Sequence, residues 1–171
     1  MNTKITLKPR KGIVIDDTLE ICFQQTFDDI MSYINLQCVC ISNKCYLFDN
    51  NLCLEFDANN KLQYIEISNC DIFTLDIWGQ NPFKLLDNEL ITFLNKHCGI
   101  DIFLNYDKIT DYIIKKQDIS LYREISPYEL LSSIEEAKIN GDYNADMDLD
   151  YLMSRFFNTI GIGNNGYFSN A

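Results

Sequence analysis

Residues 37–77 read QCVCISNKCYLFDNNLCLEFDANNKLQYIEISNCDIFTLDI, and this stretch limits the architectures that the chain can adopt. Short β-prone runs alternate here with breaks rich in Asn, Asp and Ser, residues that tolerate turn geometry. Links this short require antiparallel pairing, because a parallel return needs a crossover of about a dozen residues or more. We therefore predict a β-meander with strands over 37–41, 45–48, 52–56, 62–67 and 72–77.

The segment before the meander predicts two short strands and then a helix. Residues 5–7 and 12–15 are β-prone, and Pro9 separates them because proline cannot donate to a central ladder. Residues 16–18, Asp-Asp-Thr, offer N-caps for a helix over 18–35. The apolar residues of that segment recur at the spacing of one helical face: Leu19, Phe23, Phe27, Ile30, Met31 and Ile34.

The segment after the meander predicts a helix, a strand and a hairpin. The helix begins with Asp87 as its cap and ends at Gly99, a residue suited to a helix C-terminus. Residues 100–104 read as a returning strand. Residues 110–115 and 119–125 form a second hairpin through a polar turn.

Residues 126–129, Ser-Pro-Tyr-Glu, are the clearest helix start in the chain. Ser126 suits the N-cap, Pro127 suits the first helical position, and Glu129 can close a capping box. Asn140-Gly141 then ends this helix.

A last helix and an irregular tail complete the chain. The helix is capped by Asp146 or Asp148, and its apolar face consists of Leu149, Leu152, Met153 and Phe156. The tail over 158–171 is irregular, and its glycine-rich part, residues 161–166, predicts a loop or an edge segment. The sequence as a whole predicts one α+β domain over 1–171, with a mainly antiparallel sheet, the β-meander, packed against several helices.

Composition favours a folded, acidic binding protein. Of 171 residues, 47% are hydrophobic, which is ample for a packed core. Acidic residues outnumber basic ones by 25 to 14, and the formal net charge is -11. Phosphate backbones repel such a surface, so direct nucleic-acid binding is not expected. An acidic surface can instead steer a basic protein into contact.

The sequence predicts a cytoplasmic protein. Residues 1–11 lack the apolar region and small-residue cleavage site of a signal peptide. No apolar stretch approaches the roughly 20 residues of a membrane span, so no membrane contact is expected. The seven cysteines are then free thiols, and their odd number argues against a closed disulfide framework.

The sequence contains few residues or motifs typical of catalytic sites. His97 is the single histidine, and its neighbour Cys98 diverges from it by about 100° on a helix, so the two should not face each other. The chain has no Gly-x-Ser-x-Gly elbow and no nucleotide-binding fingerprint. We predict a protein that is not an enzyme. The alternative that stays open is a cysteine-dependent hydrolase or transferase in which His97 serves a distant thiol.

Two patterns resemble metal sites but depart from them. Cys38-x-Cys40, with Cys45 and Cys53 nearby, lies in apolar strands without the paired spacing of structural zinc, which favours buried thiols. Residues 142–150 alternate oxygen-bearing side chains as an EF-hand loop does, yet methionine stands at its sixth and twelfth positions. We predict a solvated acidic loop there, and no metal or cofactor.

The same acidic segment is a candidate binding surface. Residues 126–151 hold seven acids against one base, Lys138. Tyr143 and Tyr151 interleave with the acids, and aromatic rings beside carboxylates can receive Lys and Arg side chains. A charged solvent face without a partner is the simpler interpretation of the same residues.

In its layout the chain resembles the immunity proteins of bacterial contact-dependent growth inhibition. The features concerned are residues 11–18 (KGIVIDDT), the helix predicted after them, the meander, and residues 119–125 (ISLYREI). The resemblance spans most of the chain but rests on no specific motif. It implies a non-enzymatic cytoplasmic protein that neutralises the C-terminal toxin domain of a cognate effector. Many such toxins are nucleases, whose nucleic-acid-binding surfaces are basic.

The resemblance also suggests where such a toxin would bind. An acidic inhibitor can cover a basic active surface without chemistry, and a toxin hairpin can extend an open sheet edge. The 110–125 hairpin is the edge candidate, with Tyr112, Lys115, Tyr122 and Arg123 as an exposed face. A general protein–protein interaction module and any oligomeric state remain open. The predicted partner-binding residues are Tyr112, Tyr122, Arg123, Asp142, Tyr143, Asp146, Asp148 and Asp150.

Overall fold

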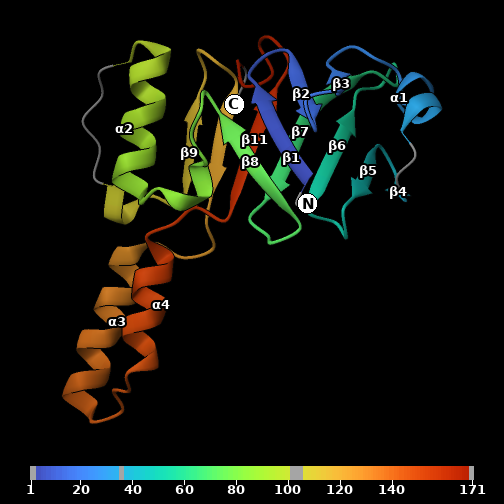
Figure 1. Ribbon diagram of the computed structural model, residues 1–171. Helices are drawn as coiled ribbons and strands as arrows, with labels where there is room; N and C mark the ends of the chain where they lie inside the picture. Colours follow the sequence, from blue (N-terminus) through green and yellow to red (C-terminus); the bar gives the residue numbers. More distant parts are fainter. Residues whose placement is uncertain (1–2, 35–36, 101–105, 170–171) are drawn as a thin grey trace.

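The computed structural model describes residues 3–34, 37–100 and 106–169 (Figure 1). These residues form eleven strands in two sheets, four α-helices and two short 3-10 helices. All strand pairs within the sheets are antiparallel except one. The predicted class, a single α+β domain with mainly antiparallel sheet, is confirmed.

The larger sheet contains most of the predicted meander. Its seven strands are, in spatial order, β4 (Val39–Ile41), β5 (Lys44–Leu47), β6 (Leu52–Phe56), β7 (Leu62–Ser68), β11 (Thr159–Gly163), β10 (Ile119–Tyr122) and β9 (Asp111–Ile114). The first four follow one another through short turns, as predicted. The β9–β10 hairpin is also confirmed, with Leu121 opposite Tyr112.

The fifth predicted meander strand lies in the other sheet, so that part of the prediction is wrong. The smaller sheet has the order β3 (Leu19–Cys22), β2 (Gly12–Ile15), β1 (Thr3–Lys8) and β8 (Phe73–Ile77). β8 pairs in parallel with β1, with Leu75 opposite Ile5. β11 takes the place beside β7 that the meander assigned to β8, with Ile160 opposite Ile67. β8 can therefore bury its apolar side against the core from the smaller sheet.

The predicted helix over 18–35 is also wrong in its first half. Residues 19–22 are strand β3, where Ile21 lies opposite Ile13. The helix α1 (Phe27–Tyr33) begins later, at the N-cap Thr26, whose side chain and that of Asp29 form a capping box. Asp16 and Asp17 are not caps, since both have positive φ in the turn between β2 and β3. At residues 19–22 strand pairing is favoured over the predicted helix because it buries the Ile21 side chain completely.

The other helices follow their local signals closely. α2 (Asp87–Cys98) ends at Gly99 in the left-handed conformation, and α3 (Pro127–Asn140) begins with the Ser126–Glu129 capping box and ends at Gly141. Two caps differ from the prediction. Leu86, not Asp87, is the N-cap of α2, and Ala145, not Asp146 or Asp148, is the N-cap of α4 (Asp146–Ser154). The strand predicted over 100–104 falls, beyond Ile100, outside the described residues.

The predicted irregular tail contains a central strand. β11 lies between β7 and β10, so the loop-or-edge prediction is wrong for residues 161–163, whereas residues 164–166 do lie in a turn. Gly161 is required at this point because a Cβ there would overlap the hydroxyl groups of Tyr64 and Ser120. The chain after β11 is held by the buried Asp118 carboxylate, which accepts hydrogen bonds from the backbone N–H groups of Gly166 and Phe168.

The two sheets and α2 share one apolar core. Its members include Ile5 and Ile13 from the smaller sheet, Leu54 and Ile162 from the larger one, and Leu94 from α2, all fully or almost fully buried. α3 and α4 lie outside this arrangement and extend side by side away from the sheets (Figure 1). Among the described residues, no helix has the length and apolar character needed to cross a membrane.

Candidate functional site

Most residues of the α3–α4 hairpin are exposed. The helices contact each other, and α3 also contacts the 3-10 helix η2 (Tyr106–Lys108). Only Pro127 and Ile134 of α3 and Ser154 of α4 are buried. Most of this hairpin is therefore surface, and Figure 1 shows it projecting from one end of the larger sheet.

Large apolar side chains of the hairpin lie in solvent. Leu149, Leu152 and Met153 have 58%, 52% and 56% of their surface exposed, and their spacing places them on one face of α4. The sequence predicts these positions as the apolar face of a helix, and in the structure each of them is more than half exposed. Further exposed apolar residues of the hairpin are Tyr128, Leu131, Ile139 and Tyr143. Exposed apolar side chains that form a contiguous patch are typical of interaction sites, which makes this face a candidate.

Carboxylates surround these apolar side chains. All seven acids of the hairpin are exposed: Glu129, Glu135, Glu136, Asp142, Asp146, Asp148 and Asp150. With Lys138 as the only base over 127–154, this segment carries more than half of the chain's formal charge of -11. We call the exposed apolar and acidic residues of 127–154 the hairpin surface.

The free end of the hairpin brings together the predicted residues Asp142, Tyr143, Asp146, Asp148 and Asp150. The Tyr143 hydroxyl donates to Asp148 Oδ2 at 2.6 Å, and this hydrogen bond raises the pKa of Tyr143. The Lys138 ammonium lies 4.8 Å from the centre of the same ring. Asp146, Asp148 and Asp150 belong to helix α4, so they do not form the calcium-loop geometry that their alternation resembles. The predicted acidic loop is therefore partly helical.

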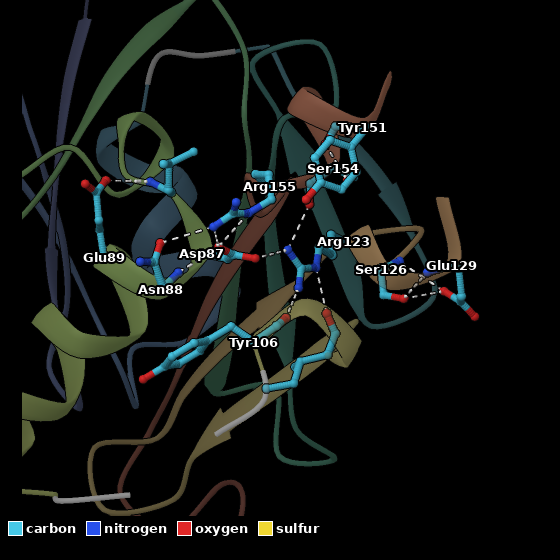
Figure 2. A network of polar contacts seen from close by, with 12 residues as sticks. Asp87, Asn88, Glu89, Tyr106, Arg123, Ser126, Glu129, Tyr151, Ser154 and Arg155 are labelled. Carbon is cyan, nitrogen blue, oxygen red and sulfur yellow. Dashed lines mark hydrogen bonds and ion pairs between the residues drawn. The ribbon is translucent and has the colours of Figure 1, made fainter. Parts of the chain in front are cut away.

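A buried ion cluster fixes the base of the hairpin (Figure 2). Asp87, at the start of α2, is fully buried, and its Oδ2 accepts a hydrogen bond from Arg123 Nη1 at 2.9 Å. Its Oδ1 accepts from Arg155 Nη2 at 2.9 Å, and its backbone N–H donates to the Arg155 carbonyl. The same Arg123 nitrogen also donates to the Ser154 carbonyl at 2.8 Å. One carboxylate thus joins α2 to the end of β10 and to the end of α4.

The two arginines determine the charge state of Asp87. Burial alone raises the pKa of this carboxyl group, but hydrogen bonds from Arg155 and Arg123 outweigh that effect and hold its pKa below the ordinary value. Arg123 Nε and Nη2 also donate to the carbonyls of Ile109 and Tyr106. The guanidinium of Arg123 thus donates four hydrogen bonds to groups within the protein.

The face predicted as exposed on the β9–β10 hairpin forms only in part: Lys115 and Tyr122 are exposed, whereas Arg123 is buried. Arg123 is 1% exposed, which contradicts its assignment to an exposed face. Tyr112 lies opposite the buried Leu121, and its hydroxyl donates to Asn95 on α2 at 3.0 Å. Tyr122 is 44% exposed on the other face of the sheet. β9 is the last strand at one end of the larger sheet in the described chain, so the edge itself is confirmed.

His97 packs against aromatic rings. Its ring stacks on Trp78 with centroids 4.8 Å apart, and it also contacts Phe93 at 4.4 Å. His97 Nδ1 lies 2.9 Å from the Phe93 carbonyl, which acts as an acceptor. His97 is exposed while Cys98 is buried, as expected for neighbours that diverge on a helix. These contacts describe a packed surface histidine.

The structure separates the four cysteines that the sequence grouped. Cys38, Cys40 and Cys45 converge, with their sulfur atoms all within 4.8 Å of one another. Cys53 lies opposite Tyr46 on β5, the neighbour of Cys45, so it faces the other side of the sheet. Cys45 and Cys53 are buried as predicted, whereas Cys40 is exposed. Sequence spacing alone could not reveal this convergence, because it depends on the β4–β5 pairing, in which Cys40 lies opposite Cys45.

Comparisons with protein-family models, curated proteins and solved structures found no match for this chain.

Proposed function

We propose that this chain is a non-enzymatic binding protein that neutralises a basic toxin domain by holding it against the hairpin surface. The observation that carries the proposal is the projecting α3–α4 hairpin, where large apolar side chains stand in solvent among seven carboxylates. The layout resemblance to immunity proteins of contact-dependent growth inhibition supplies the class of partner. A nuclease is the favoured toxin because its nucleic-acid-binding surface is basic.

The two kinds of side chain on the hairpin surface would serve the two stages of binding. Exposed carboxylates attract a basic partner over a distance and raise its association rate. Apolar anchors then leave water, and full burial of one Leu or Met side chain stabilises a complex by about 1.5–3 kcal/mol. Leu149, Leu152 and Met153 are the natural anchors since they share one face of α4.

The charge of the hairpin surface favours a basic protein over the other occupants. A second copy of this chain would bring the same acidic segment against itself, and like charges repel across an interface. Nucleic acids and anionic membranes carry negative charge and are repelled for the same reason. The buried Asp87 cluster supports the proposal in another way, because it holds the base of the hairpin in one position before a partner arrives.

The test starts with a tagged chain used as bait in a lysate of its own host. The matched baits are Leu149→Ser/Leu152→Ser on the hairpin and Ile41→Ser/Ile72→Ser on exposed positions of the body. We expect the wild type and the body variant to retain a basic C-terminal domain of a large surface protein, and the hairpin variant to lose it.

Toxicity then distinguishes neutralisation from simple binding. The captured domain should arrest growth when it is expressed alone, and growth should return when the wild-type chain is co-expressed. Equal capture by all three baits would contradict the assignment to the hairpin surface. Capture of a domain that does not arrest growth would leave an interaction module and overturn the immunity function.

A further inference from the structure

A cluster of four sulfur atoms lies at the β4–β5 end of the larger sheet. Figure 1 shows that this end of the sheet lies away from α3 and α4. Cys40 and Cys45 are direct cross-strand partners, with their sulfurs 3.0 Å apart. Cys38 lies two residues before Cys40 on the same side of the chain, and Met31 of α1 places its Sδ 3.8 Å from Cys38 Sγ. Three thiols and one thioether therefore gather from three separate elements of the fold.

The spacing of these sulfurs suits a bound metal ion. A metal bonded to sulfur at about 2.3 Å holds neighbouring sulfur ligands roughly 3.8 Å apart. The Cys40 and Cys45 sulfurs are 3.0 Å apart and all three sulfurs lie within 4.8 Å of one another, so the cluster is close to that separation. Small side-chain rotations that move each sulfur by about 1 Å or less would thus allow Cys38, Cys40 and Cys45 to bind one ion.

The type of ligand selects the type of metal. Thiolate and thioether sulfur together favour Cu(I), whereas structural zinc takes its fourth protein ligand from Cys, His, Asp or Glu. The fourth sulfur here is the thioether of Met31. We propose that Cys38, Cys40 and Cys45, with Met31 as a weaker fourth ligand, form a binding site for one Cu(I) ion.

The surroundings of the cluster fit such a site. Cys40 and Cys45 line an open surface recess together with Phe27 and Asn43, so an ion could reach the sulfurs from solvent. Three neighbouring thiolates repel one another, and a bound metal ion would supply the compensating positive charge.

The test is a Cu(I) titration of the full reduced chain without oxygen, in competition with a chromogenic Cu(I) chelator. The wild type should retain one Cu(I) per chain, and Cu(I) should raise its Tm. Cys40→Ser and Cys38→Ser should each lose this copper. Met31→Leu should weaken the affinity roughly tenfold, as expected for a supporting contact. Cys22→Ser and Cys70→Ser, which alter thiols outside the cluster, should behave as the wild type does.

Three outcomes of these measurements would contradict the proposed site, and Cys40 is the position where the fold is least at risk. Cys45 is 1% exposed, so its substitution risks the fold, whereas Cys40 is exposed and its serine variant should retain the wild-type circular dichroism spectrum. Copper binding that is equal in the wild type and Cys40→Ser would overturn the site. Zn(II) binding of higher affinity than Cu(I), unaffected by Met31→Leu, would overturn the choice of metal. A Cys40–Cys45 disulfide that persists under reducing conditions, detected by mass spectrometry, would overturn the site altogether.

Discussion

Arg123 and Asp87 form an ion pair that lies wholly inside the protein, with 2.9 Å between Arg123 Nη1 and Asp87 Oδ2. The same Arg123 nitrogen donates to the carbonyl of Ser154, the last residue of α4. The projecting hairpin is thus tied to the body by a charge that has no access to water. The cluster holds the proposed binding surface in place, although none of its members belongs to that surface.

Asp87→Asn should destabilise the protein strongly. The substitution leaves Arg123 buried without its counter-charge, and breaking a buried pair in this way costs about 3–5 kcal/mol. The free energy of unfolding from urea titration measures the effect. Glu20→Gln is the matched control, because its pair with Lys8 is exposed and such pairs contribute about 0–1 kcal/mol. A similar loss in both variants would show that the cluster has no special role.

The depressed pKa of Asp87 makes part of the stability dependent on pH. A carboxyl group whose pKa is lower in the folded state stabilises that state above its unfolded pKa, about 3.9 for Asp. This contribution is lost as the pH falls through the folded-state pKa. We expect the difference in unfolding free energy between wild type and Asp87→Asn to be constant near neutral pH and to shrink below about pH 4. Urea titrations across this range check it, and a constant difference would contradict it.

Gly161→Ala should destabilise the centre of the larger sheet. The new methyl group would overlap the hydroxyl groups of Tyr64 and Ser120, and overpacking of this kind costs about 1–3 kcal/mol. The cost should be smaller in a Ser120→Ala background, because one of the two obstructing hydroxyl groups is then absent. Thermal unfolding of the four proteins in this cycle measures the coupling. An additive cycle would show that Ser120 does not limit the space at Gly161.

Local sequence signals predicted the positions of many helices and strands correctly. The Ser126–Glu129 capping box and Gly99 placed the start of α3 and the end of α2 because their hydrogen bonds and backbone angles are set by nearby residues. The short Asn-rich turns placed β5 to β7 for the same reason. Gly161 led to the wrong prediction of a loop. The structure requires glycine there because of the space that Tyr64 occupies, and Tyr64 is nearly a hundred positions away in the chain.

The wrong sequence predictions concern which other part of the chain each segment packs against. β3 has a helical spacing of apolar residues, but pairing with β2 buries Ile21. β8 continues the meander in sequence, but β11 occupies the place beside β7. The sequence around Arg123 predicts an exposed side chain, yet the ion pair with Asp87 holds Arg123 in the protein interior. The acids at the tip of the hairpin were predictable because they depend on composition, whereas the exposure of Leu149 and Leu152 was not, because it depends on what the rest of the chain leaves uncovered.

If the proposed function is correct, charge reversal on the hairpin should slow the capture of the basic toxin domain. Asp142→Lys/Asp150→Lys changes two exposed acids of the hairpin surface that lie outside the first turn of α4. Surface plasmon resonance with the captured domain should show an association rate lower by about tenfold or more at low salt, and a weaker dependence of that rate on salt. Dissociation should change less, because the apolar anchors remain.

The matched control is Glu20→Lys/Asp28→Lys, which makes the same change in net charge on exposed positions of β3 and α1. If the hairpin surface receives the basic domain, a comparison at physiological salt should show the control slowing association much less than Asp142→Lys/Asp150→Lys, because screening there confines each charge to a neighbourhood of about 8–10 Å. Equal slowing by the two pairs would mean that only the total charge matters. The acids of the hairpin would then have no specific role, and the toxin would have to bind elsewhere, with the β9 edge as the next surface to test.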